Sequence, residues 1–174
     1  MSSPRTIDVT IHHLEMLDPR WLIPVPRTDD DAAVRRARIP CPALNRFFYQ
    51  EVGRPWRWTD RLPWSEDRWR AYVERPALAT WIVYLGDTPA GYFELESQAE
   101  GNVEIAYFGL LPQFVGRRLG GYLLTVAVEQ AWASGASRVW VHTCTLDHPH
   151  ALRNYTARGF RQFREEVQRK VVDA

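Results

Sequence analysis

A glycine-rich turn is the segment of this sequence best suited to chemistry. It runs from Gly116 to Gly121, contains two arginines, and follows an apolar segment that ends at Pro112. A helix that begins at such a turn directs several backbone N–H groups at one point, and its dipole adds partial positive charge there. A pyrophosphate would fit this nest of amides without a metal. A plain strand-to-helix turn with surface arginines explains the same residues equally well, since neither GxGxxG nor a P-loop lysine is present.

Cysteine and histidine are weaker candidates. The two cysteines, Cys41 and Cys144, lie in no metal-ligand or CxxC spacing, so we expect reduced thiols rather than a disulfide. His142, His148 and His150 are not spaced as structural zinc ligands, and no cysteine pair completes the set. We therefore predict no metal. An acyl-cysteine intermediate on Cys144 is conceivable, but no residue near it in the sequence clearly activates the thiol.

Tryptophan is concentrated in one short segment, which contains Trp56, Trp58, Trp64 and Trp69, interleaved with arginines and carboxylates. Aromatic walls with carboxylates suit a small ammonium group through cation–π contact. The arginines would equally hold the carboxylate of an amino acid. A hydrophobic cluster beneath an irregular lobe is a third interpretation, so the sequence names no substrate.

The C-terminal half supplies the elements that must position the glycine-rich turn. Strands are predicted over residues 80–85, 90–96 and 103–111, each separated from the next by a turn. The helix that opens at Gly116 repeats apolar residues at helical spacing and stops at Gly135. A strand at 137–143, a helix at 149–158 and a strand at 160–172 follow. This order implies a parallel crossover, and hence a mixed α/β sheet with helices on both faces.

The N-terminal half is less regular. A first strand is predicted over residues 7–14 and an extended, proline-rich loop over 18–26. Three acidic residues favour a helix start near Asp31, with interruption by Pro40 and Pro42. A second helix is predicted over 43–52, and Ser65 is expected to cap a third.

Bulk composition narrows the class of protein. The chain has 174 residues and a formal net charge of +1, which fits one domain and gives no global attraction to nucleic acid or acidic membranes. It contains no apolar run of membrane-spanning length, and the N-terminal residues lack the apolar core of a secretory signal. We therefore expect a cytoplasmic protein, made of an acceptor-side lobe (about 1–79) and a cofactor-binding core (about 80–174) of one domain.

Four segments, taken in order, resemble the GCN5-related N-acetyltransferase family. They are the hairpin at 86–92, the strand at 103–110, the loop and helix at 110–124, and the segment 151–160 with its tyrosine–glycine–phenylalanine pattern. The resemblance implies the fold of that family, in which the strand before the loop bulges and splays away from the next one. It implies that acetyl-CoA lies in the resulting gap.

The resemblance also assigns residues to the cofactor. The pantetheine arm would bond to backbone groups of Phe108, Gly109 and Leu110, and His148 would stand where many members contact that arm. The pyrophosphate would lie on Gly116, Arg117, Arg118, Leu119, Gly120 and Gly121. The sequence departs from the family pattern at two positions, because Val115 cannot donate a side-chain hydrogen bond to phosphate and Arg118 replaces a glycine. Backbone amides supply most of the binding, so binding should survive these changes.

For catalysis, the resemblance implies that Tyr155 is the general acid, because this tyrosine reaches the thioester sulfur in the family. Glu104, on the strand leading to the cofactor loop, is the first choice for the general base, with Glu94 and Glu96 as alternatives. The corresponding expectation is an acetyl-CoA-dependent N-acetyltransferase that acts by direct attack of a small primary amine in a ternary complex. Trp56, Trp58, Trp64 and Glu94 are assigned to the acceptor. A non-catalytic acyl-CoA-binding module, an enzyme for a longer acyl chain, and a homodimer remain open.

Overall fold

The computed structural model describes residues 5–27 and 29–172, so the first residues of the N-terminal segment considered for a signal lie outside it. Its strands form one seven-stranded sheet in the order β2-β3-β4-β5-β6-β1-β7. Only β5 and β6 pair in parallel; the other neighbours are antiparallel. The strand bounds are β1 Arg5–Met16, β2 Ala32–Arg36, β3 Leu78–Leu85, β4 Thr88–Ser97, β5 Asn102–Leu110, β6 Arg138–Cys144 and β7 Arg161–Val172.

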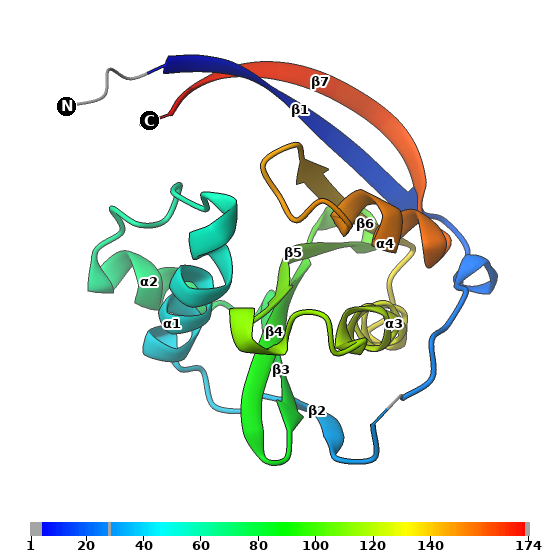
Figure 1. The fold of residues 1–174 in the computed structure, drawn as a ribbon. Coiled ribbons are helices and arrows are strands. Elements are labelled where there is room, and N and C mark those ends of the chain that lie inside the picture. The colour runs from blue at the N-terminus through cyan, green and yellow to red at the C-terminus, as the bar shows by residue number, and fades with distance from the viewer. Residues whose placement is uncertain (1–4, 28, 173–174) are drawn as a thin grey trace.

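Helices cover both faces of this sheet, as Figure 1 shows. Helices α1 (Pro42–Gly53) and α2 (Glu66–Val73) lie on one face, and α3 (Leu119–Ala133) lies on the other, with α4 (Ala151–Ala157) beside it. The main core lies between the sheet and α3, whose apolar face is fully buried along Leu123, Ala127 and Ala131. The predicted mixed α/β fold, its parallel crossover and most of its elements are confirmed.

The prediction of a helix near Asp31 is wrong. Residues 32–36 form β2, an edge strand paired with β3 from Ala32↔Leu85 to Arg36↔Trp81. Asp29 instead closes a turn, because its side chain accepts a hydrogen bond from the Asp31 N–H. The acidic signal is therefore that of a turn, and pairing with β3 overrides a weak helix preference.

A gap opens between β5 and β6 immediately beyond three paired residues. The parallel pairing covers Asn102↔Arg138, Val103↔Val139 and Glu104↔Trp140 and then stops. The register between β4 and β5 shifts at the same level, since Leu95 pairs with Ile105 while Glu94 pairs with Tyr107, which leaves Ala106 as a bulge. The bulge bends β5 away from β6, so backbone groups of its second half are free to bind a ligand.

Strands β1 and β7 form a long ribbon on the far side of β6. Their pairing runs from Arg5↔Val172 to Glu15↔Arg161, whereas β1 contacts β6 only from Ile11 onwards. The outer half of the ribbon therefore arches beyond the rest of the sheet, with β7 at its edge (Figure 1).

Candidate active site

A cavity of about 590 Å³ lies where β5 and β6 diverge. Its walls come from the second half of β5, the end of β6, the start of α3, α4 and the segment 56–60. Most of the residues assigned from the sequence meet here: Trp56, Trp58, Phe108, Gly109, Leu110, Gly116, Arg118, Leu119, Gly120, Gly121, His148 and Tyr155. Arg117, Glu104, Glu94 and Trp64 are not among the residues that line it.

The glycine-rich turn forms one part of the cavity wall. Gly116 has φ +84°, and Arg118 caps α3 in a left-handed conformation with φ 60°. Because the cap makes no side-chain hydrogen bond, the first N–H groups of the 15-residue helix are left for a ligand. No acidic side chain occupies the first turn, so the helix dipole is not neutralised there. This arrangement fits an anion.

Tyr155 lies on α4 and lines the same cavity as the glycine-rich turn. Its side chain is only 6% exposed, and its ring packs edge-on against Phe108 with centroids 6.2 Å apart. Burial, together with the negative charge of Asp147, raises the pKa of the Tyr155 hydroxyl well above its ordinary value. The hydroxyl therefore keeps its proton at neutral pH and is available as a donor. Asn154, its neighbour, connects α4 to α3 through a 3.4 Å bond from Nδ2 to the Gly120 carbonyl.

Asp147 is a cavity residue that the sequence reasoning missed. Its Oδ2 accepts hydrogen bonds from Thr143 Oγ1 at 2.6 Å and from the Cys144 N–H at 3.0 Å, and its Oδ1 accepts from Trp58 Nε1 at 3.3 Å. It thereby fixes the loop after β6 to the tryptophan-rich segment. An aspartate three residues beyond the end of a strand favours a turn. The sequence could therefore have predicted the turn at Asp147, but not the hydrogen bond with Trp58.

His142 and Glu104 form a pair beside the gap. The two residues point to the same face of neighbouring strands, with His142 Nδ1 3.3 Å from Glu104 Oε1. Glu104 is held from its other side, because its Oε2 accepts a 2.9 Å hydrogen bond from Gln98 Nε2 and Gln98 in turn accepts one from Trp140. The hydrogen bond to Glu104 raises the pKa of the His142 imidazole. His142 lines the cavity and its side chain is 48% exposed, so a ligand can reach it.

The tryptophan-rich segment divides into two parts. Trp56 and Trp58 face the cavity; Trp56 packs edge-on against His148 at 4.8 Å, and Trp58 packs against Tyr107 at the same distance. Burial lowers the pKa of His148, which favours the neutral ring next to Trp56.

The other part is an aromatic cage that Arg61 already fills. The guanidinium carbon lies 4.0–5.8 Å from the ring centroids of Tyr49, Trp64, Trp69, Tyr72 and Tyr107. The cage that the sequence suggested for a substrate ammonium thus holds the chain's own cation, and Trp64 belongs to it.

Glu94 is the counter-ion of that arginine. It is fully buried and accepts hydrogen bonds from Asn45 at 2.8 Å, Arg61 at 3.1 Å and Tyr72 at 2.7 Å. With its oxygens engaged inside the protein, Glu94 stabilises the lobe around α1 and α2, away from the cavity. Of the two carboxylates considered as alternatives to Glu104, Glu96 likewise pairs with Arg75, at 2.8 Å.

Among the described residues, no group of three His, Cys, Asp or Glu side chains is placed to hold a metal ion. No helix within residues 5–27 and 29–172 combines the length and apolar character needed to cross a membrane.

A mixed sheet whose parallel strands splay over a glycine-rich helix start is the architecture of an acetyltransferase. The family model of the acetyltransferase (GNAT) family matches residues 44–160, which is well over half of the chain. The protein belongs to this family, whose members transfer acyl groups and generally use acetyl-CoA.

Solved structures agree with this assignment at the level of the fold. A GCN5-related N-acetyltransferase from Kribbella flavida aligns with a TM-score of 0.66 and 18% identity over 95% of this chain, which spans 59% of that protein. An aminoglycoside acetyltransferase from an uncultured soil metagenomic sample aligns with a TM-score of 0.59 and 13% identity, covering 75% of this chain and 89% of that one. An IAA acetyltransferase from Bacillus cereus aligns with a TM-score of 0.57 and 24% identity, covering 76% of this chain and 79% of that one. No curated protein matches the sequence.

Proposed function

We propose that this protein is an acetyl-CoA-dependent N-acetyltransferase that acetylates a primary amine of a small molecule by direct attack. The observation that carries the proposal is one continuous cavity that joins the glycine-rich turn, the free edge of β5 and Tyr155 to Trp56, Arg57, Trp58 and Asp60. A cofactor bound to one end would present its thioester near the gap between β5 and β6, where an acceptor can enter from the other face.

The residues present fit acetyl-CoA. The amides of Gly120 and Gly121 at the start of α3 would receive the pyrophosphate, with Arg118 adding positive charge. Backbone groups of Phe108, Gly109 and Leu110 that point away from β4, toward the gap, would bond the pantetheine arm. Glycine is required at position 109, because a Cβ there would meet Val52 at 2.4 Å. His148 would contact the same arm from the opposite wall.

The chemistry then requires two proton transfers. The amine nitrogen attacks the thioester carbonyl carbon, the carbon–sulfur bond breaks, and the CoA thiolate leaves. Tyr155, whose raised pKa keeps it protonated, donates its proton to the sulfur. A base must take the proton that the amine loses.

We assign that base to His142, with Glu104 as the residue that positions it. Glu104 does not line the cavity, whereas His142 does and contacts Glu104 through Nδ1, which leaves Nε2 for the acceptor amine or a water. The carboxylate stabilises the imidazolium that forms on proton uptake, as in other carboxylate–histidine pairs. The role given to Glu104 from the sequence thus becomes an indirect one.

Direct attack is favoured over an acyl-cysteine intermediate. Cys144 does line the cavity, but burial, followed by the charge of Asp147, raises the pKa of its thiol. A raised pKa reduces the thiolate population that would act as nucleophile.

The acceptor side of the cavity suits an amine. Asp60 and Asp147 contribute carboxylates there, and Trp56 and Trp58 contribute aromatic faces, a combination that attracts an ammonium group. The related structures carry names with quite different acceptors, an aminoglycoside and IAA, so the shared fold leaves the acceptor undetermined.

Calorimetric titration with acetyl-CoA, followed by a thiol-release assay across a panel of amines, tests the proposal. Saturable binding and amine-dependent release of CoA are expected. Absence of binding at millimolar acetyl-CoA would refute it, and binding without turnover on any amine would favour a non-catalytic acyl-CoA-binding module. Larger thermal shifts with longer acyl-CoAs than with acetyl-CoA would indicate a different acyl donor.

The pH dependence of kcat/KM tests the base. The rate should fall as pH drops through the pKa of His142, which the hydrogen bond with Glu104 raises above its ordinary value. Glu104→Gln removes the negative charge beside His142 and should lower the pKa of the imidazole. The maximal kcat/KM should therefore fall, and the acidic limb of the pH profile should move to lower pH. Deprotonation of the acceptor amine also affects the pH profile, but that contribution moves only when a different amine is used. A shift in Glu104→Gln with the same amine therefore reports on His142. An unchanged limb in Glu104→Gln would remove His142 from this role.

A further inference from the structure

Strand β7 forms an open edge of the sheet. It is the last strand in the sheet order, and within the described chain its only strand neighbour is β1. An edge of 12 residues with free N–H and C=O groups is a template for pairing with another strand. Three apolar side chains on it are substantially exposed, namely Phe163 (45%), Val167 (62%) and Val171 (70%).

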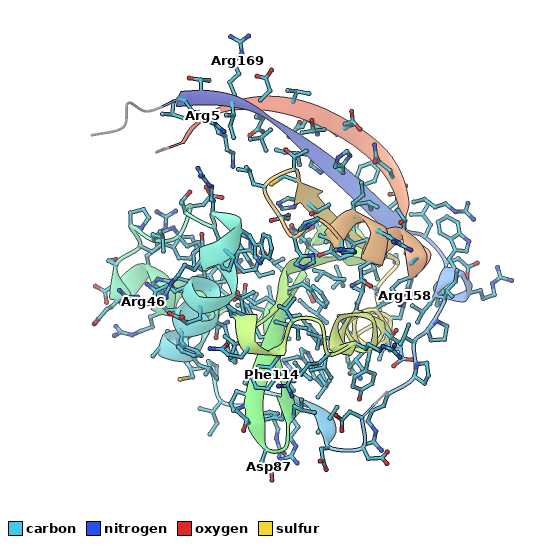
Figure 2. All side chains as sticks on the ribbon, viewed as in Figure 1. Arg5, Arg46, Asp87, Phe114, Arg158 and Arg169 are labelled. Carbon is cyan, nitrogen blue, oxygen red and sulfur yellow. The ribbon has the colours of Figure 1, made fainter. Side chains whose placement is uncertain are left out.

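The two faces of β7 differ in their surroundings. Lys170 faces inward and lines the cavity, so residues of even number from 164 to 170 share that face. Arg169 points away from the body of the molecule, as Figure 2 shows, and its side chain is 83% exposed. Glu165 and Val167 alternate with it on the same outer face. Phe163 lies outside this regular segment, at the bulge where the register with β1 shifts.

Pairing of β7 with β7 of a second copy is restricted to a few registers. In an antiparallel pair of identical strands, a residue whose backbone groups point toward the partner strand lies opposite another residue with outward-pointing groups. The twofold axis therefore passes between one residue and the same residue of the other copy, and this residue defines the register. An axis at Val167 places Val167 against its own copy and Glu165 against Arg169 of the partner, twice. On the inner face it places Glu166 against Gln168, and Arg164 against Lys170.

The neighbouring registers are less complementary on the outer face. An axis at Glu166 places that glutamate against itself and Glu165 against Val167. An axis at Gln168 gains a Glu166–Lys170 pair on the inner face but places Val167 against Arg169. Only the axis at Val167 matches apolar with apolar and acid with base on the exposed side. The like-charged contact of this register, Arg164 against Lys170, also occurs twice, and Arg164 is already neutralised by Glu166 of its own chain.

We propose that two copies of this chain associate through antiparallel pairing of their β7 strands, with the twofold axis at Val167. The association joins two sheets into one and covers the exposed Val167. It leaves the contacts of Glu165 with His12 (3.2 Å) and of Arg169 with Asp8 (3.5 Å) in place, because carboxylate and guanidinium groups bond several partners at once.

Two charge reversals and their mixture test the register. Sedimentation equilibrium should find a dimer for the full chain. Glu165→Arg faces Arg169 of its partner, and Arg169→Glu faces Glu165, so each variant alone should dimerise at least about tenfold more weakly. An equimolar mixture of the two restores both acid–base pairs and should recover the dimer as a heterodimer. Circular dichroism of each variant verifies its fold, and Glu129→Arg, at an exposed position of α3, is the matched control that should leave the dimer unchanged.

The outcomes are distinct. The proposal would be overturned if the wild-type protein were monomeric at a concentration of roughly 100 μM, which sets the weakest dissociation constant that we would accept for a dimer. Variants that dimerise as tightly as the wild type would overturn it as well, since the interface would then lie elsewhere. If Glu165→Arg and Arg169→Glu each dimerise weakly but their mixture forms no heterodimer, the register with its axis at Val167 is overturned.

Discussion

Replacement of Arg61 by methionine should destabilise the protein by an amount that the buried network allows us to bound. The substitution leaves the Glu94 carboxylate, which is fully buried, with two neutral donors, Asn45 and Tyr72, and no counter-charge. Loss of one partner of a buried ion pair costs about 3–5 kcal/mol. For a chain of this size that corresponds to a decrease in Tm of roughly 6–20 °C. The substitution also removes the cation–π contact of the guanidinium with Tyr107, which lines the cavity, so the KM for the acceptor should rise.

The double variant Arg61→Met/Glu94→Gln separates charge from packing. It removes both ions at nearly constant volume, so it should recover at least about 1 kcal/mol relative to the sum of the two single changes. Glu94→Gln alone should cost less than Arg61→Met, because the stranded guanidinium keeps cation–π contacts with five rings. The stranded carboxylate keeps only two neutral hydrogen-bond donors, Asn45 and Tyr72. Urea unfolding followed by circular dichroism measures all three. A loss below about 1 kcal/mol in Arg61→Met, or strict additivity in the double variant, would refute the account of a buried charge pair.

Three further substitutions test other parts of the structure. Tyr155→Phe should lower kcat by about 10²–10⁴-fold with little change in the KM for acetyl-CoA, measured by steady-state thiol release, and near-normal turnover would remove the general-acid assignment. Gly159→Ala should destabilise by more than about 1–3 kcal/mol in urea, because φ is +102° and a Cβ would lie 1.9 Å from the Trp21 carbonyl oxygen; equal stability would contradict that close approach. Ser65→Ala should cost about 1 kcal/mol by loss of the cap that accepts from the Arg68 N–H at 3.2 Å, and Ser65→Asp should preserve it.

The elements around the glycine-rich turn could be predicted because their signals are local. Alternating β-branched and aromatic residues mark β3 and β4, and the apolar spacing from Leu119 to Ala131 marks α3. Strand β2 could not be predicted, since it exists only through pairing with β3, whose paired residues lie 45 to 53 positions further along the chain. The gap beside β5 was expected only from the family resemblance, because the bulge at Ala106 on which it depends leaves no mark in composition.

The relations between site residues were beyond reach for a related reason. Glu104 was identified as a candidate base, but its contact with His142 follows from the register Glu104↔Trp140, which puts the histidine two residues further along the same face. The cage around Arg61 joins α1, α2, β5 and the segment between the two helices, so a run of tryptophans gave no indication that it was already filled.

The two ends of the proposed site should respond differently to sequence change. The proposed cofactor end consists of backbone amides at the start of α3 and the free edge of β5, so we expect it to tolerate Val115, whose side chain cannot bond phosphate, and Arg118, which adopts the left-handed conformation at a cost of roughly 1 kcal/mol. The proposed acceptor end consists of side chains, namely Trp58, Asp147 and His142, each fixed by a specific partner. A single substitution there changes shape, charge and proton transfer together. Acceptor choice should therefore vary with these side chains, while acyl-CoA binding follows the backbone.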